Sequence, residues 1–478
     1  MLLMAVEYDT FEALDNALGF TAKCGFTLKS LQITDIEAFA GWDVSLNRYE
    51  VGGGKTVIAT AVSLMRGHDL TIVTVPPILI APWVRWLEKF GMKVVRYQGT
   101  PKDRRLLAKE FNDARWIVCS HAIFRDDFDE LYGASLGTRF GLIVDEAHFA
   151  KNSKSVLFKR IVAISSGKDC QLLTGTPTSK PIDAYAYIKL KTPTVYRSLT
   201  HFENMHVAER DFFKQPIAWE GLDTVRQHLD VQTISRTKLE VHGYDNAPLF
   251  PDTTYSLSPE HYRLYTKLVD EQLLMFDDGS KIDATTAQKL YHALQQVIVN
   301  YDHFSNDPDA RSTAFDLIDS VIDQTECATV SPDKSKLIIW THYKRTSARV
   351  LEYVTKLGIK AVAAYSGANS QKSFDLFMTD PETRIGVFQY QSAGAGLNPQ
   401  SVCWEALFLE LNTTPLQNVQ AAGRLDRVGQ MHKPTMRYAV AEGTIQHKLL
   451  KNLLDKDDLV QKVESNRNSL RKVLLGLA

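Results

Sequence analysis

The sequence contains few cysteines and no long apolar run. Its five cysteines are scattered over 478 residues, and none lies close to another along the chain. An odd, scattered set argues against a disulfide framework and against a cysteine-rich zinc site. No stretch approaches the roughly 18 apolar residues of a membrane-spanning helix, and Glu7 and Asp9 come too early for a signal peptide. These absences predict a soluble protein of the cytoplasm that is neither secreted nor bound to a membrane.

A strong net charge is also lacking. The chain has 55 Lys and Arg residues against 56 Asp and Glu residues. This balance does not exclude a nucleic-acid partner, because binding depends on local rather than total charge. The length is too great for one compact core, so two or three domains are expected.

What the sequence does contain is two series of short apolar runs that alternate with helix-like segments. The runs of the first series are residues 70–75, 116–119, 142–144 and 171–173. Those of the second are residues 336–340, 361–364, 385–388, 406–409 and 436–440. Such alternation is typical of βαβ units and predicts an α/β fold with two parallel-sheet lobes in tandem.

The expected domain limits follow from the segments between these series. Residues 1–25 form an N-terminal segment, 26–247 the first lobe and 248–478 the second, with the boundary near Asp245–Asp252, where prolines interrupt regular structure. Residues of about 185–235 and 255–325 are expected to be helical insertions. From Thr444 onward, apolar residues recur at helical spacing and predict a C-terminal helix.

A glycine-rich loop provides the first chemical signal, at Gly52-Gly53-Gly54-Lys55-Thr56. Successive glycines let backbone N–H groups surround a phosphate, and a following helix N-terminus favours the negative charge. In such a loop Lys55 reaches the β- and γ-phosphates and the Thr56 hydroxyl ligates Mg²⁺. The full Walker A pattern has a further glycine where this chain has Tyr49. Alone, a glycine-rich loop is more often a simple turn.

A pair of acids follows about ninety residues downstream, at Asp145-Glu146-Ala147-His148, directly after an apolar run. Carboxylates at the end of a buried strand can hold Mg²⁺ and a water against a nucleoside triphosphate. Asp145 would hold the metal, and Glu146 would orient or deprotonate the water. The alternative is a salt-bridged strand end, but the spacing to the loop favours the catalytic interpretation. Together the two motifs predict an ATP-driven motor.

Two further segments complete this pattern. Thr174 and Thr176 carry hydroxyls at the end of another predicted strand and could link the nucleotide to a moving element. Arg424 and Arg427 are three residues apart, so on a helix they would share one face. Two guanidiniums on one face suit a γ-phosphate whose charge shifts during transfer. The alternative for the arginine pair is a solvated basic face.

These motifs resemble those of superfamily 2 helicases of the Swi2/Snf2-like group, over residues of about 28–444. Residues 50–56 resemble its motif I, and residues 28–32 its glutamine motif. Val75-Pro76, followed by Trp83, resembles motif Ia, and Ser120-His121 stands where motif Ib would fall. Lys151-Asn152 extends the Asp-Glu-Ala-His box as is common in that group. Residues 173–177, 392–398 and 420–430 resemble motifs III, V and VI.

The resemblance implies two RecA-like lobes that clamp ATP and Mg²⁺ between them. Its nucleotide-binding, metal-binding and catalytic positions would be Gln32, Gly52, Gly53, Gly54, Lys55, Thr56, Asp145, Glu146, Gln420, Arg424 and Arg427, with Gln32 reading the adenine. It implies nucleic-acid contact or coupling at Pro76, Ser120, Thr174, Thr176, Ser392, Gly394 and Asn398. Backbone contacts of this kind carry no sequence information and are sensitive to salt.

Three positions depart from the group's pattern: Gly53, Ala393 and Asp426. None removes a group that handles phosphate or metal, so an active ATPase is expected. Other histidines and tryptophans receive a plainer interpretation. His121, His201, His206, His228 and His342 show no metal-ligand spacing and are expected at the surface or in the polar core. Trp83 and Trp86 are expected to pack a helix.

The expected task is remodelling of branched DNA by a monomer: fork regression, branch migration or limited unwinding. A compact motor without a visible recruitment domain is typical of phages and bacteria. Two alternatives remain open. One is a transcription-linked ATPase that acts on RNA polymerase, because the Gly423–Arg427 segment resembles that of bacterial members of the group with this role. The other is the motor subunit of a restriction system.

Overall fold

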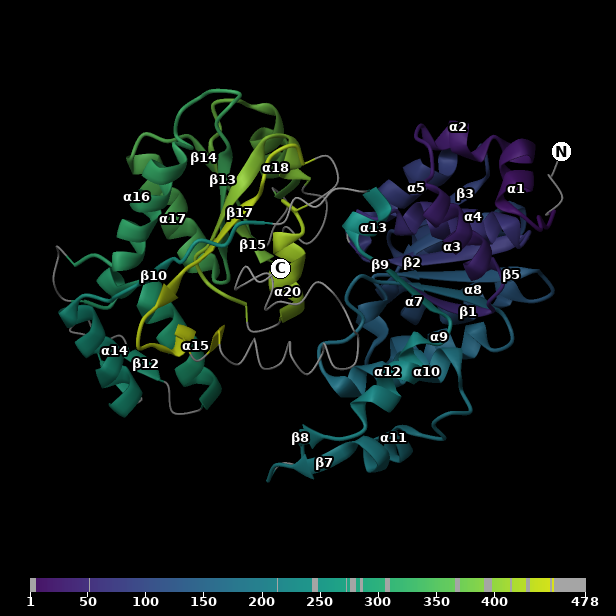
Figure 1. The fold of residues 1–478 in the computed structure, drawn as a ribbon, viewed down its shortest axis with the longest axis horizontal. Helices are drawn as coiled ribbons and strands as arrows, with labels where there is room; N and C mark the ends of the chain where they lie inside the picture. The colour runs from purple at the N-terminus through teal and green to yellow at the C-terminus, as the bar shows by residue number, and fades with distance from the viewer. Residues whose placement is uncertain are drawn as a thin grey trace. The chain divides into compact units, whose positions relative to one another are not determined.

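A computed structural model gives the fold of the chain. It describes residues 6–50, 52–212, 214–242, 248–271, 273–275, 281–283, 287–305, 310–365, 370–390, 398–412, 415–426, 430–447 and 449–450. The chain folds into two compact units that divide between Asp245 and Asn246. Each unit is built on its own sheet (Figure 1).

Unit 1 is built on a seven-stranded sheet of order β3-β4-β2-β5-β6-β1-β9, in which every neighbouring pair is parallel. Its strands are β1 Val44–Tyr49, β2 Leu70–Val75, β3 Val94–Tyr97, β4 Trp116–Ser120, β5 Phe140–Asp145, β6 Asp169–Leu173 and β9 Thr233–Arg236. Its helices are α1 Phe11–Leu18, α2 Phe20–Cys24, α3 Ser30–Ala40, α4 Lys55–Met65, α5 Ile80–Glu88, α6 Pro101–Leu107, α7 His121–Asp126, α8 Phe128–Ser135, α9 Val156–Ser165, α10 Ala184–Lys191, α11 Leu199–His206, α12 Leu222–Asp230 and α13 Lys238–His242.

The apolar runs become strands because helices cover both faces of this sheet. Along β5, Leu142 packs into one core cluster and Ile143 into the other. Ile72 and Val73 of β2 divide in the same way. Helices α1, α3, α4 and α5 cover one face, and α7 to α12 cover the other (Figure 1). A strand buried on both faces reads as a continuous apolar run, which is why these four runs were visible in the sequence.

The stretch of about 185–235 is less helical than expected. Besides α10, α11 and α12 it contains an antiparallel hairpin, β7 Val207–Arg210 with β8 Pro216–Trp219. It also contains β9, which pairs in parallel with β1 and forms an edge of the main sheet. The sequence Thr-Ile-Ser-Arg of β9 is half-buried and mostly polar, so it gives no apolar run to detect.

Unit 2 is built on a five-stranded parallel sheet of order β14-β15-β13-β16-β17. Its strands are β13 Lys336–Thr341, β14 Ala361–Ala364, β15 Ile385–Gln389, β16 Cys403–Phe408 and β17 Thr435–Tyr438, with short pairs made by β10 Thr254–Tyr255 with β18 Val440–Ala441 and β11 Leu273–Met275 with β12 Lys281–Asp283. Its helices are α14 Pro259–Glu271, α15 Ala287–Val299, α16 Thr313–Thr325, α17 Lys344–Lys356, α18 Ser370–Thr379 and α20 Pro415–Ala422. Residues 451–478, which hold most of the predicted C-terminal helix, lie outside the described residues.

A buried carboxyl group caps α17 in unit 2. Glu410 is fully buried and accepts hydrogen bonds from the backbone N–H groups of His342 and Tyr343, at 2.8 and 3.0 Å, and from the Thr346 hydroxyl at 2.7 Å. These donors include the start of α17, where backbone N–H groups lack helical partners. Burial raises the pKa of Glu410 to about 7, although the three hydrogen bonds act in the opposite direction.

The predicted fold class, two parallel-sheet α/β lobes in tandem, is confirmed by these two sheets. All five cysteines are free and buried. Among the described residues, no helix has both the length and the apolar character needed to cross a membrane.

Candidate nucleotide site

The glycine-rich loop connects β1 to α4, and its glycines are required by its geometry. Gly52 and Gly54 have φ of 86° and 99°, a backbone region that other residues rarely adopt. At Gly53, a Cβ atom would come within 2.9 Å of Tyr49 Cδ2 and 3.2 Å of the Glu50 carbonyl oxygen. The loop is therefore folded tightly against the end of β1, and α4 begins directly after it.

Lys55 places its ammonium group over this loop. Its Nζ donates to the carbonyl oxygens of Tyr49 and Glu50, at 2.8 and 3.2 Å. Thr56 follows in the first turn of α4 and is half-buried. A cation, a hydroxyl and a helix N-terminus in one loop suit the phosphates of a nucleotide.

Gln32 binds the loop from α3. Its side-chain amide donates to the Gly53 carbonyl at 3.1 Å, and its Oε1 accepts from the Lys29 backbone N–H at 3.0 Å. The side chain is buried, and a Cβ at Gly54 would approach its Nε2 to 2.9 Å. The structure thus gives Gln32 a role in holding the loop; its reading of adenine stays a prediction.

Asp145 lies at the end of β5 with its carboxyl group buried. Its Oδ2 accepts from the Trp83 indole N–H at 2.8 Å and its Oδ1 from the Glu146 backbone N–H at 2.9 Å. Burial, followed by the charge of Glu146, raises the pKa of Asp145 to about 6, while the Lys55 ammonium acts in the opposite direction. A buried carboxylate with too little compensating charge is suited to a divalent cation, and Mg²⁺ prefers such hard oxygen ligands. The Asp145 carboxylate and the Thr56 hydroxyl therefore fit the predicted metal.

Trp83 has a role that its spacing did not reveal. It was expected to pack a helix, and its ring is indeed buried in α5. Its N–H group also fixes Asp145 across 62 residues of sequence. The only sequence signal was the position of Trp83 shortly after Pro76 in the motif Ia segment.

Glu146 has a strained backbone. Its φ of 49° and ψ of 51° lie in the left-handed region, and it precedes the short helix Ala147–Ala150. Such a conformation costs on the order of 1–3 kcal/mol for a residue other than glycine. Its side chain is 30 % exposed and its Oε2 lies 3.2 Å from His148 Nδ1. Glu146 thus places a partly exposed acid directly after a buried strand.

Predicted site residues from neighbouring strands lie at the same edge of the sheet as Glu146. Pro76, Ser120, Asp145 and Thr174 follow or end the strands β2, β4, β5 and β6, which are adjacent in the order β4-β2-β5-β6. Because parallel strands present their carboxyl ends at one edge, the four predicted segments come together there.

Individual contacts link these segments. His148 Nδ1 lies 3.4 Å from the Thr174 hydroxyl, which accepts from the Thr176 N–H at 3.2 Å. The Ser120 hydroxyl accepts from the Ile123 N–H and caps α7, and its side chain is buried. The structure thus gives Ser120 a role in capping α7, and a direct contact of Ser120 with nucleic acid stays a prediction.

His121 belongs to this cluster as well. It was expected to be a surface or polar-core residue, and its Nδ1 lies 2.8 Å from the Thr74 hydroxyl. Its ring contacts Phe149, which in turn contacts the His148 ring at 4.6 Å between centroids. Burial, followed by the proximity of His148, lowers the pKa of His121 to about 4, so it is neutral at pH 7.

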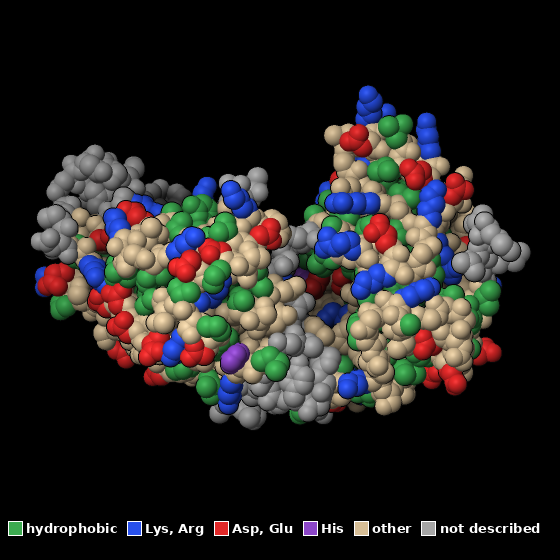
Figure 2. All heavy atoms as spheres, turned by 90° about the horizontal axis from the view of Figure 1, so that it is seen from above, with side chains coloured by type: hydrophobic (Ala, Val, Ile, Leu, Met, Phe, Trp, Pro, Cys, Tyr) green, Lys and Arg blue, Asp and Glu red, His purple; other side chains and the backbone are tan. Residues whose placement is uncertain are grey.

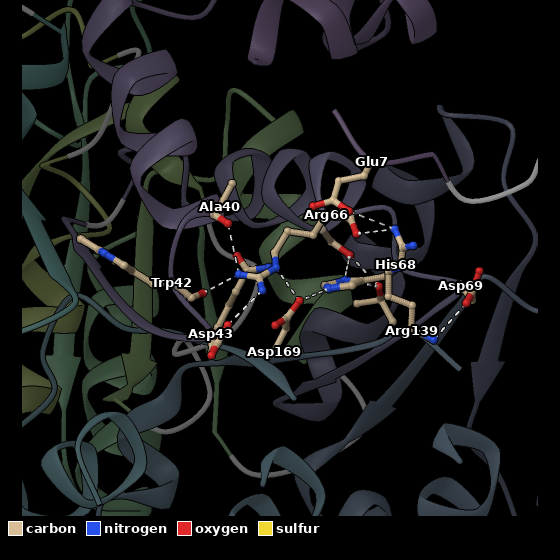
Figure 3. Close-up of polar contacts among 12 residues, drawn as sticks. Glu7, Ala40, Trp42, Asp43, Arg66, His68, Asp69, Arg139 and Asp169 are labelled. Carbon is tan, nitrogen blue, oxygen red and sulfur yellow. Dashed lines mark hydrogen bonds and ion pairs between the residues drawn. The ribbon is translucent and has the colours of Figure 1, made fainter. Parts of the chain in front are cut away.

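The far end of α4 is anchored by a second polar cluster (Figure 3). Arg66, just beyond α4, donates to the carbonyl oxygens of Ala40 and Trp42 and pairs with Asp169. His68 Nε2 lies 2.6 Å from the same Asp169 carboxylate. The helix that begins at the phosphate loop is thus held to the opposite edge of the sheet at its other end.

Fewer of the predicted site residues in unit 2 can be placed. Gln420 lies in α20 and is half-buried. Arg424 is half-buried and lies in a turn beyond α20, which ends at Ala422. Its pairing with Arg427 stays a prediction. Asn398 is exposed before a short helix at Pro399–Ser401. Arg427, Ser392 and Gly394 lie outside the described residues.

Comparison with known proteins decides the family. Residues 39–308, more than half of the chain, match the SNF2-related domain family. The chain belongs to this family. The predicted Swi2/Snf2-like membership is therefore confirmed.

The relatives in this SNF2-related family are distant in sequence. The DNA annealing helicase and endonuclease ZRANB3 of Bos taurus is 24% identical over an alignment of 426 residues, which covers 83% of this chain and 36% of that protein. The uncharacterized ATP-dependent helicase YqhH of Bacillus subtilis is 23% identical over an alignment of 440 residues, which covers 87% of this chain and 75% of that protein. The chain thus spans about a third of the ZRANB3 proteins it matches. A solved Sulfolobus solfataricus SWI2/SNF2 ATPase core in complex with dsDNA aligns over 98% of this chain and 96% of its own, with 17% identity and a TM-score of 0.39.

Proposed function

We propose that this SNF2-related chain hydrolyses ATP with Mg²⁺ and uses the energy to move along DNA. The carboxyl edge of the unit 1 sheet carries the proposal: a phosphate loop with Lys55 over it lies in the same unit as the buried Asp145 and the strained, partly exposed Glu146. Relatives named as ATP-dependent helicases support the same activity.

The residues of unit 1 divide the work of ATP hydrolysis among them. In the proposal, the backbone of Gly52, Gly53 and Gly54 surrounds the phosphates and Lys55 neutralises their charge. Thr56 and Asp145 hold Mg²⁺, which when bound withdraws charge from the phosphate oxygens. Glu146 orients the attacking water and accepts its proton.

Further residues complete the proposed machinery. Gln32 reads the adenine and keeps Gly53 in place. Gln420, Arg424 and Arg427 contribute to the nucleotide site, with the arginines neutralising the transferred phosphate. Pro76, Ser120, Thr174, Thr176, Ser392, Gly394 and Asn398 contact the DNA backbone or couple it to hydrolysis.

The proposed DNA target is branched: forks and four-way junctions, remodelled by regression, branch migration or limited unwinding. A relative named as a DNA annealing helicase supports this choice. Lys and Arg side chains are also numerous on unit 1 in the face that Figure 2 shows, although the total charge is near zero. A local excess of positive charge suits phosphate contacts. We further propose that the chain works as a cytoplasmic monomer.

The deciding experiment measures ATP hydrolysis without DNA and with single strands, duplexes, forks and four-way junctions. Glu146→Gln serves as the inactive control. Stronger stimulation by forks and junctions than by duplex, followed by strand displacement or branch migration, supports the proposal. Equal stimulation by every duplex would contradict the branched target, and no hydrolysis under any condition would contradict the ATPase itself.

A further inference from the structure

A network of three side chains, two of them buried, lies directly behind the phosphate loop. The Tyr49 hydroxyl donates to Asp35 Oδ2 at 2.6 Å. Arg236 donates to both oxygens of the same carboxylate, from Nε to Oδ2 and from Nη2 to Oδ1, each at 2.7 Å. The Asp35 side chain is only 3 % exposed. The three residues come from α3, the end of β1 and the end of β9.

Tyr49 connects this network to the loop in two ways. Its ring fills the space over Gly53, where an added Cβ would meet ring atom Cδ2 at 2.9 Å. Its carbonyl oxygen accepts the hydrogen bond from Lys55 Nζ. A change in the position of Tyr49 therefore moves both the central glycine and the hydrogen-bond partner of the lysine.

Helix α3 holds the loop at a second point through Gln32. Gln32 and Asp35 are three residues apart on α3, so they share one face of the helix. Gln32 donates to the Gly53 carbonyl, and Asp35 holds the tyrosine whose ring covers the same glycine. Gly53 is thus fixed from two sides by one helix.

Arg236 keeps this arrangement in place. A carboxylate buried as deeply as Asp35 is stable only when it is paired and hydrogen-bonded, and the two-pronged guanidinium meets that need. Burial, followed by the hydrogen bond to Asp35, raises the pKa of Tyr49 well above its usual value, so the phenol stays a donor. The buried carboxylate is thus paired with a guanidinium whose own side chain is 27 % exposed.

We propose that Tyr49, Asp35 and Arg236 are positioning residues that hold the phosphate loop in the conformation that accepts ATP. Tyr49 thus has a function at the position where the Walker A pattern has glycine. The inference rests on the proposed ATPase activity, but it concerns the affinity for nucleotide rather than the chemical step.

Unit 1 contains a matched control for this network. The Tyr97 hydroxyl donates to Asp127 Oδ2 at 2.8 Å, and Arg104 donates to both Asp127 oxygens. Tyr97 ends its strand, β3, as Tyr49 ends β1. Four strands, β4, β2, β5 and β6, separate β3 from β1. The two networks share their chemistry and differ in distance from the phosphate loop.

The experiment compares Tyr49→Phe with Tyr97→Phe in the full chain. Each variant loses one hydrogen bond to a carboxylate and keeps its ring, so both should lower the thermal midpoint to a similar extent. Only Tyr49→Phe should raise KM for ATP and weaken binding of a fluorescent ATP analogue, by roughly tenfold if most of one such hydrogen bond is transmitted to the loop. kcat should change less than twofold in both variants.

A second pair of variants tests whether the three residues act together. Arg236→Lys keeps the charge and loses the two-pronged contact, and it should raise KM as Tyr49→Phe does. The double variant Tyr49→Phe with Arg236→Lys should raise KM by less than the product of the single effects, because both act through Asp35.

The outcomes separate this inference from the proposed function. If the unmodified chain neither binds nor hydrolyses ATP, the proposed function is wrong. If it does both, and Tyr49→Phe and Arg236→Lys leave KM unchanged or Tyr97→Phe raises it equally, the positioning role alone is overturned.

Discussion

The Lys55 ammonium lies 2.8 Å from the carbonyl oxygen of Tyr49, six residues before it in the chain. This hydrogen bond spans the phosphate loop and holds the positive charge against the end of β1. The charge is therefore placed before a nucleotide arrives, which lowers the cost of organising the site.

Replacement of Lys55 by alanine should abolish most ATP hydrolysis. The loop would lose the cation that neutralises the phosphates, and a fall in kcat/KM of at least roughly 100-fold is expected. The measurement is steady-state ATP hydrolysis with saturating duplex DNA. Lys89→Ala removes a cation from the same unit, where Lys89 lies over the Trp86 ring, and it should leave hydrolysis unchanged. Equal activity of Lys55→Ala and the unmodified chain would contradict the assignment.

At Glu146, relief of the backbone strain should raise stability without restoring activity. Glu146→Gly and Glu146→Ala both lack the carboxylate and should both hydrolyse ATP at least roughly 100-fold more slowly. The glycine variant should nevertheless be more stable than the alanine variant by about 1 kcal/mol, because glycine adopts positive φ without strain. Thermal unfolding of both variants measures the difference.

Glu326 provides the control for this comparison, because its φ is also 49° and it follows α16 in unit 2. Glu326→Gly should likewise exceed Glu326→Ala in stability, with hydrolysis unaffected. Alanine and glycine variants of equal stability at position 146 would show that the strain is not relieved there.

Gln32→Glu should weaken ATP binding. The substitution preserves shape but replaces the amide donor with a carboxylate oxygen that faces the Gly53 carbonyl. The repulsion should displace the loop and raise KM for ATP by roughly tenfold. Gln171→Glu is the matched control, because the buried Gln171 amide donates to the Ala59 carbonyl within α4, away from the loop. A rise in KM with both variants would mean that the effect is general destabilisation.

Unit 2 should lose stability as pH rises through the pKa of Glu410. Its folded-state pKa of about 7 lies above the ordinary value of 4.5, so the folded chain binds the proton more tightly. The resulting stabilisation, on the order of 3 kcal/mol, is complete below about pH 4.5 and is lost as pH rises to about 7. Glu410→Gln removes this dependence. Between pH 5 and 8, the thermal midpoint of the variant should therefore rise relative to that of the unmodified chain. A difference independent of pH would contradict the assignment.

The sequence predicted the parts of the fold that depend on local patterns. Strands β2, β4, β5 and β6 were visible because burial on both faces favours apolar residues at successive positions. The phosphate loop and the acids after β5 were visible because their residue types are tied to one chemistry. β9 was missed, since a half-buried edge strand of polar residues has no periodic signature.

Contacts between distant segments could not be predicted from the sequence. Trp83 and Asp145 are 62 residues apart, and Arg236 and Asp35 are 201 apart. Each pair meets only because the strand order brings its elements together. Tyr49 was noted as a departure from the glycine pattern, and only the packing of its ring against Gly53 explains why the larger residue is accommodated.

The hydrogen bond between Trp83 and Asp145 also makes the site optically observable. Indole fluorescence responds to the charge near its N–H group, and this N–H contacts the oxygen of a proposed magnesium ligand. With the other six of the seven tryptophans replaced by phenylalanine, emission from Trp83 becomes an intrinsic signal for the arrival of the cation. Binding of the cation could then be followed by stopped-flow fluorescence, without a dye attached to the protein.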